Sequence, residues 1–131
     1  MRTLSGRRVG ALIAGVFGVV ALLSARSVSA HHGWGGYLDA EFEISGTVES
    51  PVSLAGPHAS LTIKGTDGHE WLLTLAPPPR TSSAGLKDGM LTVGSKVTAH
   101  GHRSRDPKKF EVKTERITVD GKTYNVYPDR T

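Results

Sequence analysis

Histidine is the residue type in this sequence with the clearest potential for chemistry, and His31 and His32 are adjacent. If His31 is the first residue of a mature protein, its α-amine and its ring can chelate one metal ion together, and His32 can add another nitrogen. Nitrogen ligands that tend to a square-planar arrangement suit Cu(II) or Ni(II) best among divalent metals. The pair therefore predicts a copper site, and the alternative is a polar chain start without a ligand role.

Three further histidines are candidate ligands. His58 follows Pro57, whose ring restricts the backbone just before it. His100 and His102 are two residues apart in an expected strand, so both rings leave one face with their Cα atoms roughly 7 Å apart and can hold one ion between them. The alternatives are a loop histidine that only makes a hydrogen bond and a solvated strand face. The predicted metal ligands are His31, His32, His58, His100 and His102.

The segment before His31 has the three parts of a secretory signal peptide. Basic residues near the start precede an apolar stretch over residues 9–23, and residues 24–30 end in small side chains at the −3 and −1 positions of a cleavage site. A retained anchor is the alternative, but a membrane span needs roughly 20 apolar residues. The Arg7-Arg8 pair suggests a twin-arginine signal, which the flanking glycines fit poorly. We therefore expect a cleaved Sec-type signal peptide over residues 1–30 and a periplasmic or secreted protein.

Cleavage would leave a nearly neutral chain. The sequence has 16 lysines and arginines and 12 acidic residues, but four of the basic residues lie within residues 1–30, where there is no acid. The remaining 12 basic and 12 acidic residues do not give the net positive charge that is typical of nucleic-acid binding. There is no cysteine, which excludes a disulfide and a lipoprotein anchor. The expected partner is a metal ion or small ligand, with a periplasmic protein as a further possibility and no membrane after cleavage.

Alternating apolar and polar residues predict a chain of strands after residue 41. The expected strands are 42–48, 61–65, 69–75, 95–103, 110–119 and 123–127. Pro51 is expected to close the first strand and Pro77–Pro79 the third, because proline cannot donate to a ladder. Residues 81–87 can form at most a short helix. The apolar parity slips between Val112 and Ile117, which predicts a β-bulge near residues 114–116.

This order of elements predicts an all-β fold. Five strands with one helical candidate between the third and the fourth is the order of an OB-fold barrel. We therefore expect an OB-like antiparallel barrel of five to six strands over residues 42–131, preceded by an N-terminal segment, residues 31–41. A generic small sandwich or open barrel is the alternative.

Trp34 and Tyr37 lie among glycines that imply a mobile segment. They can form a ligand platform or anchor the segment to the barrel, and for Tyr37 we expect the anchor.

Four short motifs, in their order and spacing, carry a resemblance to a known family. They are Ala30-His31-His32, Gly46-Thr47-Val48, Pro57-His58-Ala59 and Gly101-His102-Arg103-Ser104-Arg105-Asp106. With them the chain resembles the bacterial exported family of unknown function 6152 over nearly all of residues 31–131. It departs from the family pattern at residues 33–36, where a Ser-Phe type pair is expected, and at Gly56, where asparagine is usual. The resemblance implies an exported small β-barrel and brings no established activity.

The sequence offers no catalytic motif. It has no cysteine nucleophile, no Gly-x-Ser-x-Gly elbow, no His-Glu-x-x-His helix and no phosphate-binding loop. We therefore expect a periplasmic protein that binds copper or another late transition metal rather than an enzyme. One alternative is a module that binds an organic ligand or a polypeptide on the barrel face without metal. Another is a small copper-dependent redox enzyme at the N-terminal site.

Overall fold

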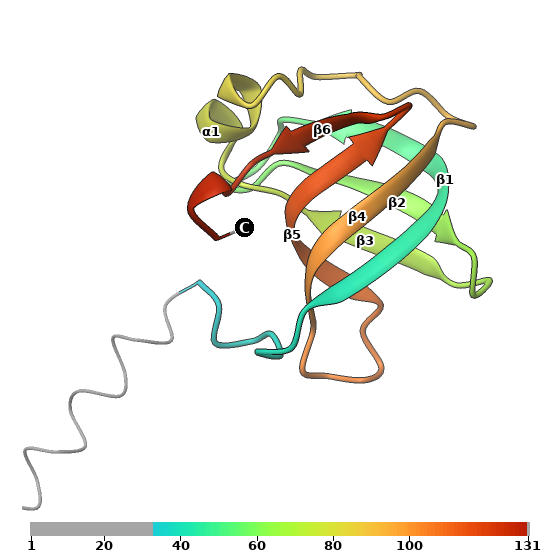
Figure 1. Cartoon of the computed structure of the whole chain (residues 1–131), viewed down its shortest axis with the longest axis vertical. Helices are drawn as coiled ribbons and strands as arrows, with labels where there is room; N and C mark the ends of the chain where they lie inside the picture. Colours follow the sequence, from blue (N-terminus) through green and yellow to red (C-terminus); the bar gives the residue numbers. More distant parts are fainter. Residues whose placement is uncertain (1–32, 131) are drawn as a thin grey trace, which may run out of the picture. The chain divides into compact units, whose positions relative to one another are not determined.

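Six strands and one short α-helix make up the part of the chain that the structure describes, residues 33–130 (Figure 1). The structure is a computed structural model. The predicted signal peptide, His31 and His32 lie outside the described residues. The elements are β1 (Phe42–Ser53), β2 (Ser60–Gly65), β3 (Glu70–Thr74), α1 (Pro78–Ser83), β4 (Lys96–Arg103), β5 (Glu111–Val119), β6 (Lys122–Asn125) and a 3-10 turn (Pro128–Arg130).

The strands form a closed barrel. Hydrogen-bonded neighbours follow the order β3-β2-β1-β4-β5-β6, and these pairs are antiparallel. A parallel pairing between β3 and β5 closes the first five strands on themselves, and β6 extends the sheet beside β5. Helix α1 connects β3 to β4 at one end of the barrel (Figure 1). The predicted all-β, OB-like barrel with one short helical connection is therefore confirmed.

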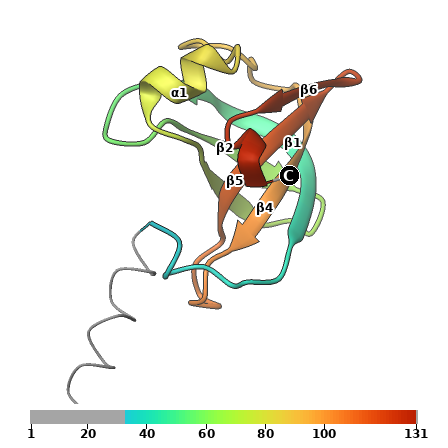
Figure 2. The same ribbon diagram turned by 60° about the vertical axis from the view of Figure 1, so that its left-hand side comes forward.

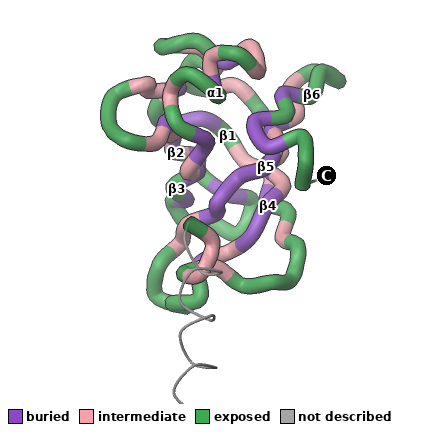
Figure 3. The backbone as a smooth tube through the Cα atoms, turned by 90° about the vertical axis from the view of Figure 1, so that its left-hand side faces the viewer, coloured by how far each residue is buried: buried purple, intermediate pink, exposed green. Residues whose placement is uncertain are grey.

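The core consists of apolar side chains from all six strands and from the segments that follow β3, α1 and β6. Buried positions recur at every second residue of β2 and β3, and they follow β4 and β5 along much of their length (Figure 3). Trp71 is the largest fully buried side chain of the described residues, and other fully buried apolar side chains are those of Val48, Leu61, Ile63, Leu73, Leu75, Leu86, Val112, Ile117 and Val126. The predicted period-two pattern is thus the pattern that packs the barrel interior.

Two proline expectations need correction. Pro51 does not close β1, which continues to Ser53. The β1–β2 register shifts on both sides of Ser50, so the proline lies where the ladder is already irregular and tolerates a missing donor. The helix begins at Pro78, earlier than the expected 81–87, because proline is favoured in the first turn of a helix, where its missing N–H is not needed.

The predicted bulge in β5 is confirmed. His100 pairs with Arg116 and Gly101 with Thr114, so Glu115 is the extra residue on β5. The two strands approach closely here, and a Cβ atom on Gly101 would overlap the carbonyl group of Lys113. The bulge adds one side chain, that of Glu115, to the outer face of the barrel beside β4.

A hydrogen-bonded aspartate stabilises the β2–β3 turn, and we expect a pH-dependent contribution from it. Asp67 accepts hydrogen bonds from the indole of Trp71 and the backbone N–H of His69. Burial raises the pKa of Asp67, but these hydrogen bonds outweigh it and hold the pKa below the ordinary value. Because Asp67 is exposed and solvent screens its charge, Asp67→Asn is expected to lower the free energy of unfolding by only about 0.5 kcal/mol at neutral pH.

The difference should vanish in acid. A carboxylate with a lowered pKa contributes its stability above the pKa of the unfolded chain and loses it as the pH falls through the folded-state pKa. Urea unfolding of both proteins at neutral and at acid pH measures this. Equal stability of wild type and variant at neutral pH would contradict the prediction.

Candidate functional site

The N-terminal segment is bonded to the outer face of the barrel at the end of β4. The backbone N–H of Leu38 donates to Arg103 O at 2.8 Å, and Tyr37 forms a bridge with Ser104. Arg105 donates from its backbone N–H to Gly36 O at 2.9 Å and from its side chain to Gly35 O at 3.1 Å. The segment expected to be mobile is therefore held in place by hydrogen bonds from residues 33–41 to residues 103–105.

Tyr37 is an anchor of this segment, as expected. Its hydroxyl donates to Glu111 Oε2 at 3.2 Å, and the other oxygen of Glu111 accepts a hydrogen bond from Thr74 at 3.0 Å. Burial, together with the charge of Glu111 and this hydrogen bond, raises the pKa of Tyr37 to about 12. Tyr37 is therefore a neutral hydrogen-bond donor at physiological pH rather than an acid–base group.

Trp34 joins the N-terminal segment to β5 and to the 3-10 turn. Its ring makes edge-on contacts with His102, with ring centroids 5.6 Å apart, and with Tyr127, at 5.2 Å. The Cζ atom of Arg130 lies 3.9 Å from the centroid of the Trp34 ring, and Lys113 Nζ lies 4.8 Å from it. Trp34 therefore covers a cluster of charged side chains on β4 and β5.

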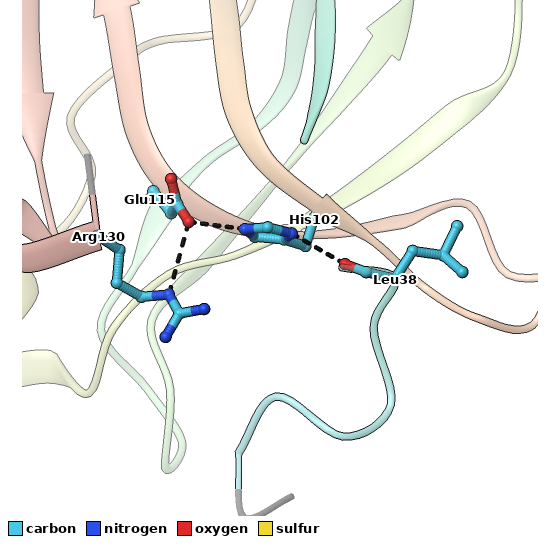
Figure 4. A network of polar contacts seen from close by, with 4 residues as sticks. All are labelled: Leu38, His102, Glu115 and Arg130. Atoms are coloured by element: carbon cyan, nitrogen blue, oxygen red, sulfur yellow. Dashed lines mark hydrogen bonds and ion pairs between the residues drawn. The ribbon is translucent and has the colours of Figure 1, made fainter. Parts of the chain in front are cut away.

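His102 is the centre of this cluster (Figure 4). Its Nδ1 atom lies 2.9 Å from Leu38 O, and because a carbonyl only accepts, Nδ1 must carry a proton. Its Nε2 atom lies 2.8 Å from Glu115 Oε1, with one proton between them. The two side chains are only 9% and 1% exposed. A histidine whose one nitrogen donates to a backbone carbonyl presents the other in a fixed direction, which is the usual arrangement of a metal-ligating imidazole.

These contacts do not use all of the hydrogen-bonding capacity of the Glu115 carboxylate. Its Oε1 atom also lies 3.6 Å from Nε of Arg130 (Figure 4). Its Oε2 atom is buried and has no hydrogen-bond partner. A buried polar atom without a partner is costly and calls for an explanation such as a bound water or ion. Oε2 is therefore a preformed ligand position.

Glu41 completes a group of three possible ligands. One possible ligand atom from each of Glu41, His102 and Glu115 lies within 4.8 Å of the other two. Within residues 33–130, these are the three residues whose possible ligand atoms come together in this way. His102 and Glu115 are buried, whereas Glu41 is exposed, so the group opens to solvent on one side. One imidazole and two carboxylates form a mixed nitrogen and oxygen set that divalent Zn, Cu or Ni can use. We call these three residues the His102 centre.

The other predicted ligands lie in two different surroundings. His58, in the loop between β1 and β2, has its pKa lowered by burial and by the charge of Lys113, and it is not among the three ligands of the His102 centre. His100 instead contacts Glu43, with Nε2 and Oε2 2.6 Å apart, so His100 and His102 each have a carboxylate of their own. His31 and His32 lie outside the described residues.

Sequence reasoning missed the carboxylates of the His102 centre. Glu41 reads as part of a solvated segment before a strand, and Glu115 as a polar residue of β5. A signal for Glu115 was present, because the parity slip predicts a bulge at residues 114–116 and bulges re-aim side chains near functional sites. Pairing Glu115 with His102 requires the register of β4 against β5, which the sequence pattern does not give.

Comparison with known proteins gives a family and a fold but no activity. No curated protein matches the chain. The structure of a ZRD-deleted mutant of TiaS in complex with agmatine is similar with a TM-score of 0.50 and 14% identity, over 66% of this chain and 26% of that one. Apo TiaS, a tRNAIle2 agmatidine synthetase, is similar with a TM-score of 0.47 and 16% identity, over 60% of this chain and 18% of that one.

These likenesses reach no further than the fold, because the chain spans about a quarter or less of those proteins. Within residues 33–130 the structure contains no helix that is long and apolar enough to cross a membrane. A family profile described as a family of unknown function (DUF6152) matches residues 19–113. That match covers more than half of the chain, and the protein therefore belongs to this family of unknown function.

Proposed function

We propose that this protein is an exported binding protein for copper or another late transition metal. The observation that carries the proposal is the convergence of ligand atoms from Glu41, His102 and Glu115 within 4.8 Å. The buried Oε2 atom of Glu115, which has no partner, supports it independently. In the proposed complex, the metal replaces the proton between His102 and Glu115, and the hydrogen bond from Nδ1 to Leu38 O keeps the imidazole aligned.

The sequence contributes a second ligand set to the same proposal. A mature chain that starts at His31 offers an α-amine and two imidazoles, which favour Cu(II). Intact mass of the exported protein checks this start, and a start at Gly33 or later would remove the chelating end. The two ligand sets are separable by experiment, because acetylation blocks the amine and leaves the His102 centre unchanged.

Glu41→Gln is expected to weaken metal binding at least about tenfold, because it removes a charged ligand while keeping the side-chain shape. The measurement is calorimetric titration of the exported protein with Cu(II) and with Zn(II). Glu43→Gln is the matched control, since Glu43 lies on β1, two residues after Glu41, and pairs with His100. We expect the control to bind metal as the wild type does.

The outcomes assign the site. Loss of binding in Glu41→Gln but not in Glu43→Gln supports the His102 centre. Loss on acetylation alone moves the metal to the His31 chelate and keeps the function. Binding that neither acetylation nor Glu41→Gln changes is adventitious, and it would contradict the proposed function.

A binding module without metal is the second candidate function. A hollow of about 410 Å³ lies on the outer face near β1 and β4. Hydroxyl groups of Ser45, Thr47 and Thr98 line it, together with Lys96 and Asp120. Its lining combines polar and apolar surface, which favours a small organic ligand that has both. This function moves to first place if the metal titrations fail.

A further inference from the structure

We infer that Arg130 is the resident counter-ion of the His102 centre and controls how tightly the centre binds a metal ion. This inference rests on the proposed function. In the metal-free protein the guanidinium of Arg130 lies beside Glu115, and a divalent cation that binds there must work against that positive charge or displace it. Arg130 is thus a positioning residue that holds the centre ready while keeping its affinity moderate.

The geometry makes Arg130 a partner that can leave. Its Nε atom is 3.6 Å from Glu115 Oε1, which is an ion pair but too long for a good hydrogen bond. Its side chain is 42% exposed, whereas that of Glu115 is 1% exposed. The other carboxylate oxygen of Glu115 remains without a partner. Arg130 therefore compensates the charge of Glu115 without filling its hydrogen-bonding capacity.

The backbone around Arg130 is attached independently of its side chain. The N–H groups of Val126 and Tyr127 both donate to the backbone oxygen of Glu115, at 2.9 and 3.1 Å. Asp129 in the same turn is paired with Arg80 at 3.0 Å. The 3-10 turn lies beside β5 (Figure 2). The guanidinium can consequently swing away from Glu115 while the turn stays in place.

Arg130 stacks on Trp34 in the same position from which its Nε atom faces Glu115. The Cζ atom of Arg130 lies 3.9 Å from the ring centroid, a separation at which a guanidinium is attracted to the face of an indole. Arg130 therefore keeps a favourable contact when a metal ion takes over the charge of Glu115. We expect metal binding to move the guanidinium away from Glu115 while it stays over the ring of Trp34.

The experiment compares the metal affinity of Arg130→Gln with that of the wild-type protein. We expect Arg130→Gln to bind Zn(II) about tenfold more tightly, because a positive charge beside the ligand atoms has been removed. Arg130→Lys, which keeps the charge, should bind as the wild type does. Lys122→Gln is the control for net charge, since Lys122 lies on β6 over the ring of Tyr124. It should leave the affinity unchanged.

The sign of the change separates this role from a structural one. If Arg130 only stabilises the fold around the centre, Arg130→Gln binds Zn(II) more weakly, and the inference is overturned while the proposed function stands. Equal affinity also overturns it. Binding by Arg130→Gln but not by the wild type supports it. If neither protein binds Zn(II) or Cu(II), the proposed function and the inference both fail. As a second measurement, the Nε–H resonance of Arg130 should shift on addition of Zn(II) in the wild type.

Discussion

Replacing His102 with alanine is expected to lower the free energy of unfolding by about 3 kcal/mol, the cost of leaving a buried charge without its partner. Glu115 is 1% exposed and would keep only the long contact with Arg130, while Leu38 O would lose its donor. His100→Ala is the matched comparison, since His100 also lies on β4 and contacts a carboxylate, that of Glu43. Its side chain and that of Glu43 are 29% and 55% exposed, so its loss should cost less than about 1 kcal/mol.

Chemical unfolding of the two variants beside the wild type measures the difference. A double variant, His102→Ala with Glu115→Leu, should recover part of the stability lost in His102→Ala, because it removes both members of the buried pair. If His102→Ala and His100→Ala lose the same small amount of stability, the contact between His102 and Glu115 contributes no more than a surface ion pair.

Gly101→Ala is expected to be strongly destabilising, with a loss of about 3 kcal/mol or more in the free energy of unfolding. The added Cβ atom would overlap the carbonyl group of Lys113, which is backbone and cannot rotate away as a side chain can. The overlap would force β4 and β5 apart at the bulge and separate His102 from Glu115. Metal binding at the His102 centre should be lost together with stability.

Gly36→Ala is the control for this prediction. A Cβ atom at Gly36 would meet no atom within 4 Å, so the change should stay within about 0.5 kcal/mol of the wild type. Thermal unfolding of both variants gives the comparison. Similar melting temperatures for Gly101→Ala and wild type would show that the two strands can separate here without cost.

Local signals in the sequence were sufficient for most of the fold. Alternation predicts β2 and β4 to within one residue, and the parity slip predicts the bulge at Glu115 because both are properties of a single strand. The error at Pro51 arose because proline was treated as a strand terminator, although it lies at a ladder irregularity. The helix was expected too late in the chain because the favourable place of Pro78 in a first helical turn was not considered.

The site was less predictable, because its contacts join residues that are distant in sequence. His102 was recognisable as a candidate ligand from its residue type alone. Its carboxylate partner depends on how β4 and β5 align, and its contact with Leu38 depends on where residues 33–41 cross the barrel. Arg130 lies far along the chain from Trp34 and carries no local signal for their contact. Residues that can bind a metal can be recognised in the sequence, whereas which of them lie together depends on the register of the paired strands.

The contact between Trp34 and Arg130 has a consequence for the order of folding. A chain that emerges from the ribosome with its N-terminus first presents Trp34 well before Arg130. Trp34 and Tyr37 must therefore wait for β5 and the 3-10 turn before they can pack. Contacts of such large sequence separation form slowly. Trp34 therefore covers the His102 centre only after these late contacts form, so ligand capture at the covered centre reports a folded molecule.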